Sequence, residues 1–132
     1  EGSVNASSQP LMAWCFADCQ GYQKCGSFTG NNNANGVFVY CGFRPAMVII
    51  RATDTSSSYM WDNKRSPFNE MNKSLAANTT DPEETSREID FLSNGFKCRE
   101  ARGSHNDAGD FVFYAVAEAP LVNSNGVPNN AR

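Results

Sequence analysis

The stretch IDFLSNGFKCRE (Ile89–Glu100) carries the clearest local signal in the chain. Two runs of alternating character flank Asn94-Gly95, a dipeptide that favours a two-residue type I′ turn because both residues tolerate positive φ. A turn centred on this dipeptide predicts a β-hairpin with a defined register. The predicted pairs are Ser93 with Phe96, Leu92 with Lys97, Phe91 with Cys98, and Asp90 with Arg99.

This register separates the side chains of the hairpin into two chemically distinct faces. Ile89, Phe91 and Cys98 share one face, which we expect to face the core. Asp90 and Arg99 form an opposite-charge pair across the strands, worth roughly a few tenths of a kcal/mol.

Short β-branched or aromatic runs, bounded by Gly, Asn, Pro or Ser, recur along the rest of the chain. Helix signals are weak, and only the stretch at 67–77 could form one or two turns. The pattern predicts an all-β fold, an antiparallel β-sandwich with a jelly-roll-like arrangement. About eight strands are expected, at Leu11–Cys19, Cys25–Thr29, Val37–Gly42, Ala46–Thr53, Ser58–Asp62, Arg87–Ser93, Phe96–Glu100 and Phe111–Glu118.

The most apolar run, MVII (Met47–Ile50), follows Pro45. Proline cannot donate to a strand ladder, so Pro45 marks the start of a strand. Four consecutive apolar residues favour a strand that is covered on both faces. The second face is therefore expected to lie in an interface.

The run LMAWCFADCQ (Leu11–Gln20) matches FVFYAVAEAP (Phe111–Pro120) in residue type rather than identity. Each has an aromatic residue near its middle, then a small residue and one acid. Two interpretations stay open: one supersecondary unit is repeated, or two buried strands simply have similar composition.

Length and charge exclude several classes of protein. At 132 residues the chain is one domain. A net charge of −3 without a basic cluster argues against nucleic-acid binding. Met47–Ile50 is far too short to cross a membrane.

The sequence offers little for catalysis. His105 is the only histidine, and it lies in the loop GSHNDAGD, which has the composition of a solvated turn. Carboxylates such as Asp62 and Glu118 could form a glycosidase pair, but nothing in the sequence selects them. Asn106 and Asp107 could belong to a calcium loop, although an ordinary turn uses the same residues. We expect no enzyme activity, metal or cofactor.

Tyr59 and Trp61 alternate in SYMWD and therefore share one face of a strand. Two interpretations remain open for this face. It belongs to the core or a subunit interface, or it is an aromatic platform for sugars. Together with His105, Asn106 and Asp107, these aromatics are the candidate ligand or interface residues.

Several sequence blocks, in a fixed order, resemble a repeat module of tailed-bacteriophage virion proteins. Such proteins occur mostly in phages of marine and freshwater bacteria and are labelled tail-fibre or structural proteins. The resemblance covers roughly Met12 to Pro120 and establishes no catalytic or ligand residue. The blocks are AWCFADCQGYQKCGSFTGN, NGVFVYCGFRPAMVIIR, WDNKRSPFN, NTTD, IDFLSNGFKCR and FVFYAVAEAP.

The resemblance implies how the chain is divided. Residues 1–10 would be a linker or the end of a preceding segment, 11–120 the β-sandwich module, and 121–132 a C-terminal tail. Leu11–Cys19 would be equivalent to the last strand of a preceding repeat. An isolated module buries its faces poorly, so arrays or oligomers are expected.

Four cysteines depart from the family pattern: Cys19, Cys25, Cys41 and Cys98 stand where a Val, an aromatic, a Thr and a Leu are usual. These departures suggest disulfides formed after release from the cell. Cys19 and Cys25 flank a predicted hairpin connection, which would leave Cys41 and Cys98 as the second pair and Cys15 buried and reduced. The alternative is that all five thiols stay free as small hydrophobic side chains.

The resemblance implies a non-enzymatic structural module on the virion exterior, made in the bacterial cytoplasm. Its expected role is host attachment in a tail fibre or tail tip. Its expected partners are further copies of itself, with a trimer favoured, other virion proteins, and a glycan or protein on the host surface. Capsid decoration or a head fibre is the alternative, and a glycan-cleaving tailspike is a third possibility.

Overall fold

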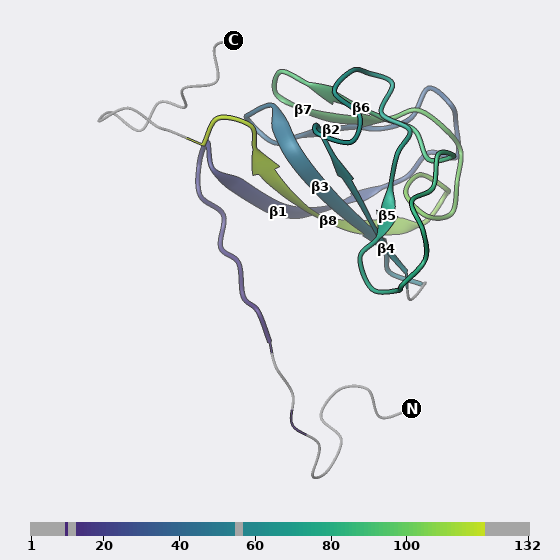
Figure 1. The fold of residues 1–132 in the computed structure, drawn as a ribbon, viewed down its shortest axis with the longest axis horizontal. Helices are drawn as coiled ribbons and strands as arrows, with labels where there is room; N and C mark the ends of the chain where they lie inside the picture. Colours follow the sequence, from purple (N-terminus) through teal and green to yellow (C-terminus); the bar gives the residue numbers. More distant parts are fainter. Residues whose placement is uncertain (1–9, 11–12, 55–56, 121–132) are drawn as a thin grey trace.

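The computed structural model describes residues 10, 13–54 and 57–120, and these residues form two antiparallel sheets packed face to face (Figure 1). The described residues contain eight strands and no helix, which confirms the predicted all-β sandwich. One sheet has five strands in the order β1 (Gln23–Thr29), β8 (Asp110–Ala117), β3 (Pro45–Ala52), β4 (Ser58–Asp62) and β5 (Leu75–Ala76). The other has three, in the order β2 (Phe38–Tyr40), β7 (Gly95–Cys98) and β6 (Ile89–Leu92).

The strand pairing is partly that of a jelly roll. β1 pairs with β8 in one sheet, and β2 pairs with β7 in the other. The first two strands of the chain therefore each pair with one of the last two, as in a jelly roll. The middle of the chain departs from this nesting, because β3, β4 and β5 follow one another as a meander. The pairing predicted as jelly-roll-like therefore holds for the outer strands only.

Alternating side chains along the strands build the core between the sheets. In β8 the odd positions Phe111, Phe113, Ala115 and Ala117 are buried, whereas the even positions keep contact with solvent. Phe28 stacks on Phe111 at 5.2 Å between ring centroids, and Phe96 meets Phe113 edge-on at 5.5 Å. Aromatic pairs in these arrangements add to the free energy gained by burial alone.

The β6–β7 hairpin forms, but its predicted register is wrong. Leu92 pairs with Gly95 and Phe91 with Phe96, so the two-residue loop is Ser93-Asn94. Gly95 serves close packing instead of a turn, because a Cβ added there would lie 2.0 Å from the Val39 carbonyl oxygen of β2. Asp90 consequently opposes Lys97, although the Arg99 side chain still reaches the Asp90 carboxylate, with 3.4 Å between Nε and Oδ2.

The faces predicted for this hairpin are correct despite the shifted register. Ile89, Phe91 and Cys98 are all buried in the core. β3 begins at Pro45 and β4 has the predicted bounds Ser58–Asp62, as the sequence indicates.

Two other expectations need correction. The described part of the predicted strand Leu11–Cys19 is irregular and exposed from residue 13 to residue 18, and only Cys19 makes a bridge, to Gln23. The weak helix signal at 67–77 instead contains the short strand β5, which pairs with β4. The predicted linker and tail lie almost entirely outside the described residues.

Candidate functional site

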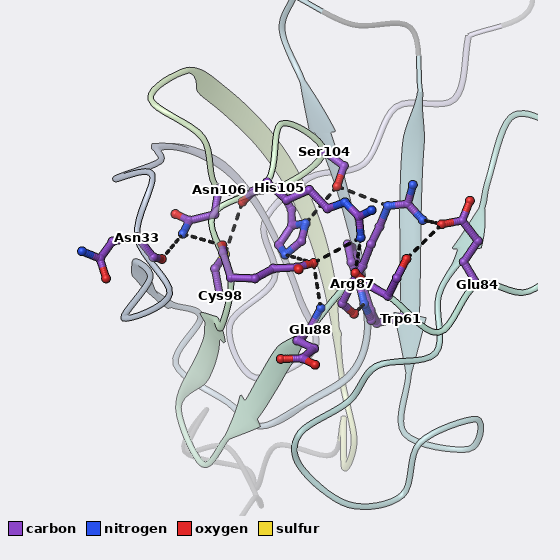
Figure 2. A network of polar contacts seen from close by, with 12 residues as sticks. Asn33, Trp61, Glu84, Arg87, Glu88, Cys98, Ser104, His105 and Asn106 are labelled. Carbon is purple, nitrogen blue, oxygen red and sulfur yellow. Dashed lines mark hydrogen bonds and ion pairs between the residues drawn. The ribbon is translucent and has the colours of Figure 1, made fainter.

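The loop at 100–109 contains most of GSHNDAGD, the stretch predicted to be a solvated turn, yet it carries two fully buried polar side chains, His105 and Asn106 (Figure 2). The His105 ring meets the Trp61 ring edge-on at 5.4 Å, and its Nδ1 lies 3.0 Å from Ser104 Oγ. The backbone oxygen of His105 accepts a hydrogen bond from Cys98 Sγ at 3.3 Å. The prediction of an exposed turn at His105 and Asn106 is therefore wrong.

Asn106 joins two loops that are far apart in the sequence. Its Nδ2 donates to the carbonyl oxygens of Asn33, at 2.8 Å, and Glu100, at 2.9 Å. Its Oδ1 accepts from the backbone N–H of Asn31 at 3.2 Å. Gly30 allows this close approach, because a Cβ there would lie 2.0 Å from the Asp107 carbonyl oxygen. Asn106 thus replaces the water that these backbone groups would otherwise bind.

The two aromatics of β4 lie against this loop and Arg87. Trp61 is fully buried, and its Nε1 donates to the Arg87 carbonyl oxygen at 3.0 Å. The Arg87 guanidinium lies 3.7 Å from the centroid of the half-buried Tyr59 ring and pairs with Glu84. The core interpretation of this face is correct, and the exposed sugar platform is absent from it.

Burial sets the charge of His105. Loss of solvent, with a smaller contribution from the cations Arg87 and Arg102, lowers its pKa to about 4, although the backbone of Glu88 acts to raise it. The imidazole is therefore neutral at pH 7, and Glu100 Oε1, 3.7 Å from Nε2, forms no ion pair with it. The ring is buried and neutral, packs against Trp61 and offers no exposed group for catalysis.

The remaining predicted chemical residues make local contacts. Asp107 Oδ1 accepts a hydrogen bond from the Gly109 N–H at 2.9 Å. This contact is that of an ordinary turn, the alternative to a calcium loop. Asp62 forms an ion pair with Arg65, with 2.7 Å between Oδ2 and Nε. Glu118 forms one with Arg44, with 3.1 Å between Oε2 and Nε. Among the described residues, no group of acidic, histidine and cysteine side chains could hold a metal ion. No described helix is long and apolar enough to span a bilayer.

All five cysteines are free thiols in the structure, so neither predicted disulfide is formed. Cys19 lies opposite Gln23 instead of Cys25, because the turn is tighter than expected. Cys41 is buried with its Sγ directed to Val39 O, and Cys98 with its Sγ directed to His105 O. Desolvation raises the pKa of both buried thiols to about 12. Cys15, expected to be buried, is exposed.

A second candidate site is the junction where the segment 13–18, here called the arm, leaves the sandwich. Cys19 and Gln23 exchange both backbone hydrogen bonds, at 3.0 Å each, around a turn in which Gly21 has a φ of 71°. A continued ladder would next pair Ala17 with Cys25. Side chains bind the two backbone groups that this pair would use. Asp18 Oδ1 accepts a hydrogen bond from the Cys25 N–H, and Gln23 Nε2 donates to the Ala17 carbonyl oxygen, each at 2.7 Å. The arm is thereby turned away from the free edge of β1.

The arm carries large apolar side chains into solvent. Trp14 is 80% exposed and Phe16 is 55% exposed. Figure 1 shows the arm running away from the two sheets. The Phe16 ring packs against the Tyr114 ring of β8, with 4.7 Å between ring centroids.

Tyr114 belongs to an apolar surface, the outer face, on the side of the five-stranded sheet away from the three-stranded sheet. Register and alternation place its members next to one another across four strands. Val112 is 45% exposed, and the other members are half-buried. The outer face consists of Cys25, Met47, Ile49, Met60, Val112, Tyr114 and Val116.

A shallow hollow of about 270 Å³ lies beside the arm junction, between the turn at 19–23 and the loop after β2. Asp18, Gln20 and Lys24 line it together with Tyr40, whose side chain is 59% exposed. Lys24 Nζ lies 5.3 Å from the centroid of the Tyr40 ring. A carboxylate, an amide, an ammonium and an aromatic ring therefore meet at one end of the sandwich.

Comparison with known proteins identifies a family. A family model, described as a domain of unknown function (DUF7483), matches residues 1–120. The chain belongs to the DUF7483 family. No curated protein and no solved structure is significantly similar to this DUF7483 domain.

Sequence reasoning missed the residues that direct the arm. No role was predicted for Asp18 or Gln23, and the exposed Trp14 was placed in the predicted strand Leu11–Cys19. One signal was present: a single acid stands between the apolar run and the glycine turn, where its short side chain can cap a backbone N–H.

Proposed function

We propose that this DUF7483 domain is a non-enzymatic structural module of a tailed-phage virion, which associates with further copies of itself in a tail fibre or tail tip. The arm junction is the observation that carries the self-association, and the sequence resemblance to tailed-phage virion modules supports the virion role. The arm displays Trp14 and Phe16 to solvent, and the Asp18 and Gln23 side chains prevent it from pairing with the β1 edge of its own chain. Exposed aromatics on a directed segment favour a protein partner.

Host contact in this proposal uses the end of the sandwich that carries the hollow. Its mixture of one acid, one base and an exposed tyrosine suits a polar ligand such as a surface glycan. Attachment is therefore separated in space from the β4 aromatics, which are in the core.

Analytical ultracentrifugation of the full chain tests the assembly. We expect concentration-dependent association at micromolar concentration, weakened on the order of 10-fold or more by Trp14→Ala. Phe68→Ala is the matched control, because Phe68 is also 80% exposed but lies outside the arm. A wild-type chain that stays monomeric at high micromolar concentration would contradict the proposal.

Quantitative mass spectrometry of purified particles tests the virion role. A tail fibre or tail tip predicts a few copies per particle. Hundreds of copies would favour capsid decoration, and absence of the chain from particles would reject the virion assignment.

A further inference from the structure

The outer face has the composition of a covered surface. An antiparallel sheet with one solvated face normally alternates apolar and polar residues. Here β3 places Val48 and Ile50 in the core and Met47 and Ile49 on the other side. β4 adds Met60 to the same side. This face is therefore suited to an apolar partner.

The structure indicates what kind of segment this surface accepts. Phe16 of the arm already packs against Tyr114 at the margin of the outer face, at 4.7 Å between ring centroids. Aromatic and aliphatic side chains of the face suit the same type of contact with Trp14. Trp14 remains 80% exposed, so its own outer face does not bury it.

Each chain therefore offers one apolar arm and one apolar face, and Phe16 of the arm packs against Tyr114 of that face within the same chain. Because arm and face are different surfaces, their union between two copies is heterologous. Heterologous contacts extend head to tail, and they close into rings when the rotation permits.

We propose that the outer face of the five-stranded sheet binds the arm of a second copy, with Trp14 and Phe16 packed over Met47, Ile49, Met60 and Val112. The inference specifies the contact within the assembly proposed above and rests on that self-association. It assigns no role to the hollow or to the buried loop.

A complementation experiment with two full-length variants tests the proposal. The arm variant is W14A/F16A, which keeps an intact outer face. The face variant is Val112→Glu, which puts a charge on the outer face while its cross-strand neighbour Arg51 can pair with it. Met60→Lys is a second face variant, used if Val112→Glu does not fold by circular dichroism.

We expect each variant alone to lose association by on the order of 30-fold or more. An equimolar mixture should restore a 1:1 dimer and no larger species, because one intact arm and one intact face remain. Self-association of the arm variant would indicate a face-to-face contact, and self-association of the face variant an arm-to-arm contact. Either result overturns the proposal.

The failures of the two proposals are distinguishable. If the wild type associates but the mixture stays monomeric, the arm-to-face contact is wrong and the assembly role stands. If the wild type does not associate, the assembly role itself fails. Phe68→Ala, outside both surfaces, should associate like the wild type.

Discussion

The loop at 100–109 and the arm at 13–18 both differ in burial from what their compositions suggest. The loop is polar, yet His105 and Asn106 are fully buried; the arm is apolar, yet Trp14 is 80% exposed. The difference lies in the available partners. Backbone groups of neighbouring loops satisfy the amide of Asn106 inside the fold, whereas side-chain caps at the arm junction direct the arm away from the nearest strand edge. The composition of a segment indicates whether its side chains favour burial or hydrogen bonding. The groups that surround the segment in the fold decide whether those side chains are buried or exposed.

The largest expected effect comes from removing the buried amide. Asn106→Ala leaves the Asn31 N–H and the carbonyls of Asn33 and Glu100 without their partner. We expect the free energy of unfolding to fall by about 3 kcal/mol, since unsatisfied buried groups cost about 1–3 kcal/mol each and the site can relax in part. Urea denaturation measures it. Asn33→Ala is the control, because its side chain is exposed and its carbonyl is retained; an equal loss in both variants would contradict the role of the amide.

The pH dependence of stability tests the burial of His105. Its pKa of about 4 in the folded protein lies below the ordinary value of 6.5. In that range the unfolded chain binds a proton that the folded chain does not, so stability falls as pH falls from about 6.5 toward 4. We expect a loss of about 2–3 kcal/mol between pH 7.5 and 4.5.

His105→Gln isolates this contribution from that of the carboxylates. Burial raises the pKa of Asp90, which acts in the opposite direction near its own titration range. The difference between the wild type and the variant should therefore shrink as the pH falls toward 4.5. A difference that is constant with pH would show that His105 is accessible to protons in the folded state.

The smallest expected effect is that of the arm on the monomer. Trp14→Ala should change the free energy of unfolding at sub-micromolar concentration by less than about 0.5 kcal/mol, because the side chain is mostly exposed. Thermal denaturation under dilute conditions measures it. A loss near that of Asn106→Ala would mean that the arm packs on its own sandwich.

The fold class was predictable because alternation and turn residues are local signals. β4 has its predicted bounds, and Pro45 starts β3 as expected. The β6–β7 register was not predictable, since Gly95 is required by the distant Val39 carbonyl and not by the turn. Likewise, the burial of His105 and Asn106 depends on loops about 70 residues away or on core aromatics, which no local pattern reveals. The outer face was anticipated in part, because four apolar residues in succession at Met47–Ile50 require cover on both sides.

Native-state alkylation of the cysteines, followed over a range of protein concentrations, tests the central contrast most directly. Cys98 is buried, and its Sγ contacts the backbone oxygen of His105. Burial raises the pKa of its thiol from 9.0 to about 12, so the fraction of reactive thiolate at a given pH is about 1000-fold lower. We predict that Cys98 stays protected at every concentration. Cys15, exposed on the arm, should react rapidly in dilute protein and become protected as the copies associate. Protection of Cys15 at all dilutions would contradict the account, and so would reaction of Cys15 at a rate that does not change with association.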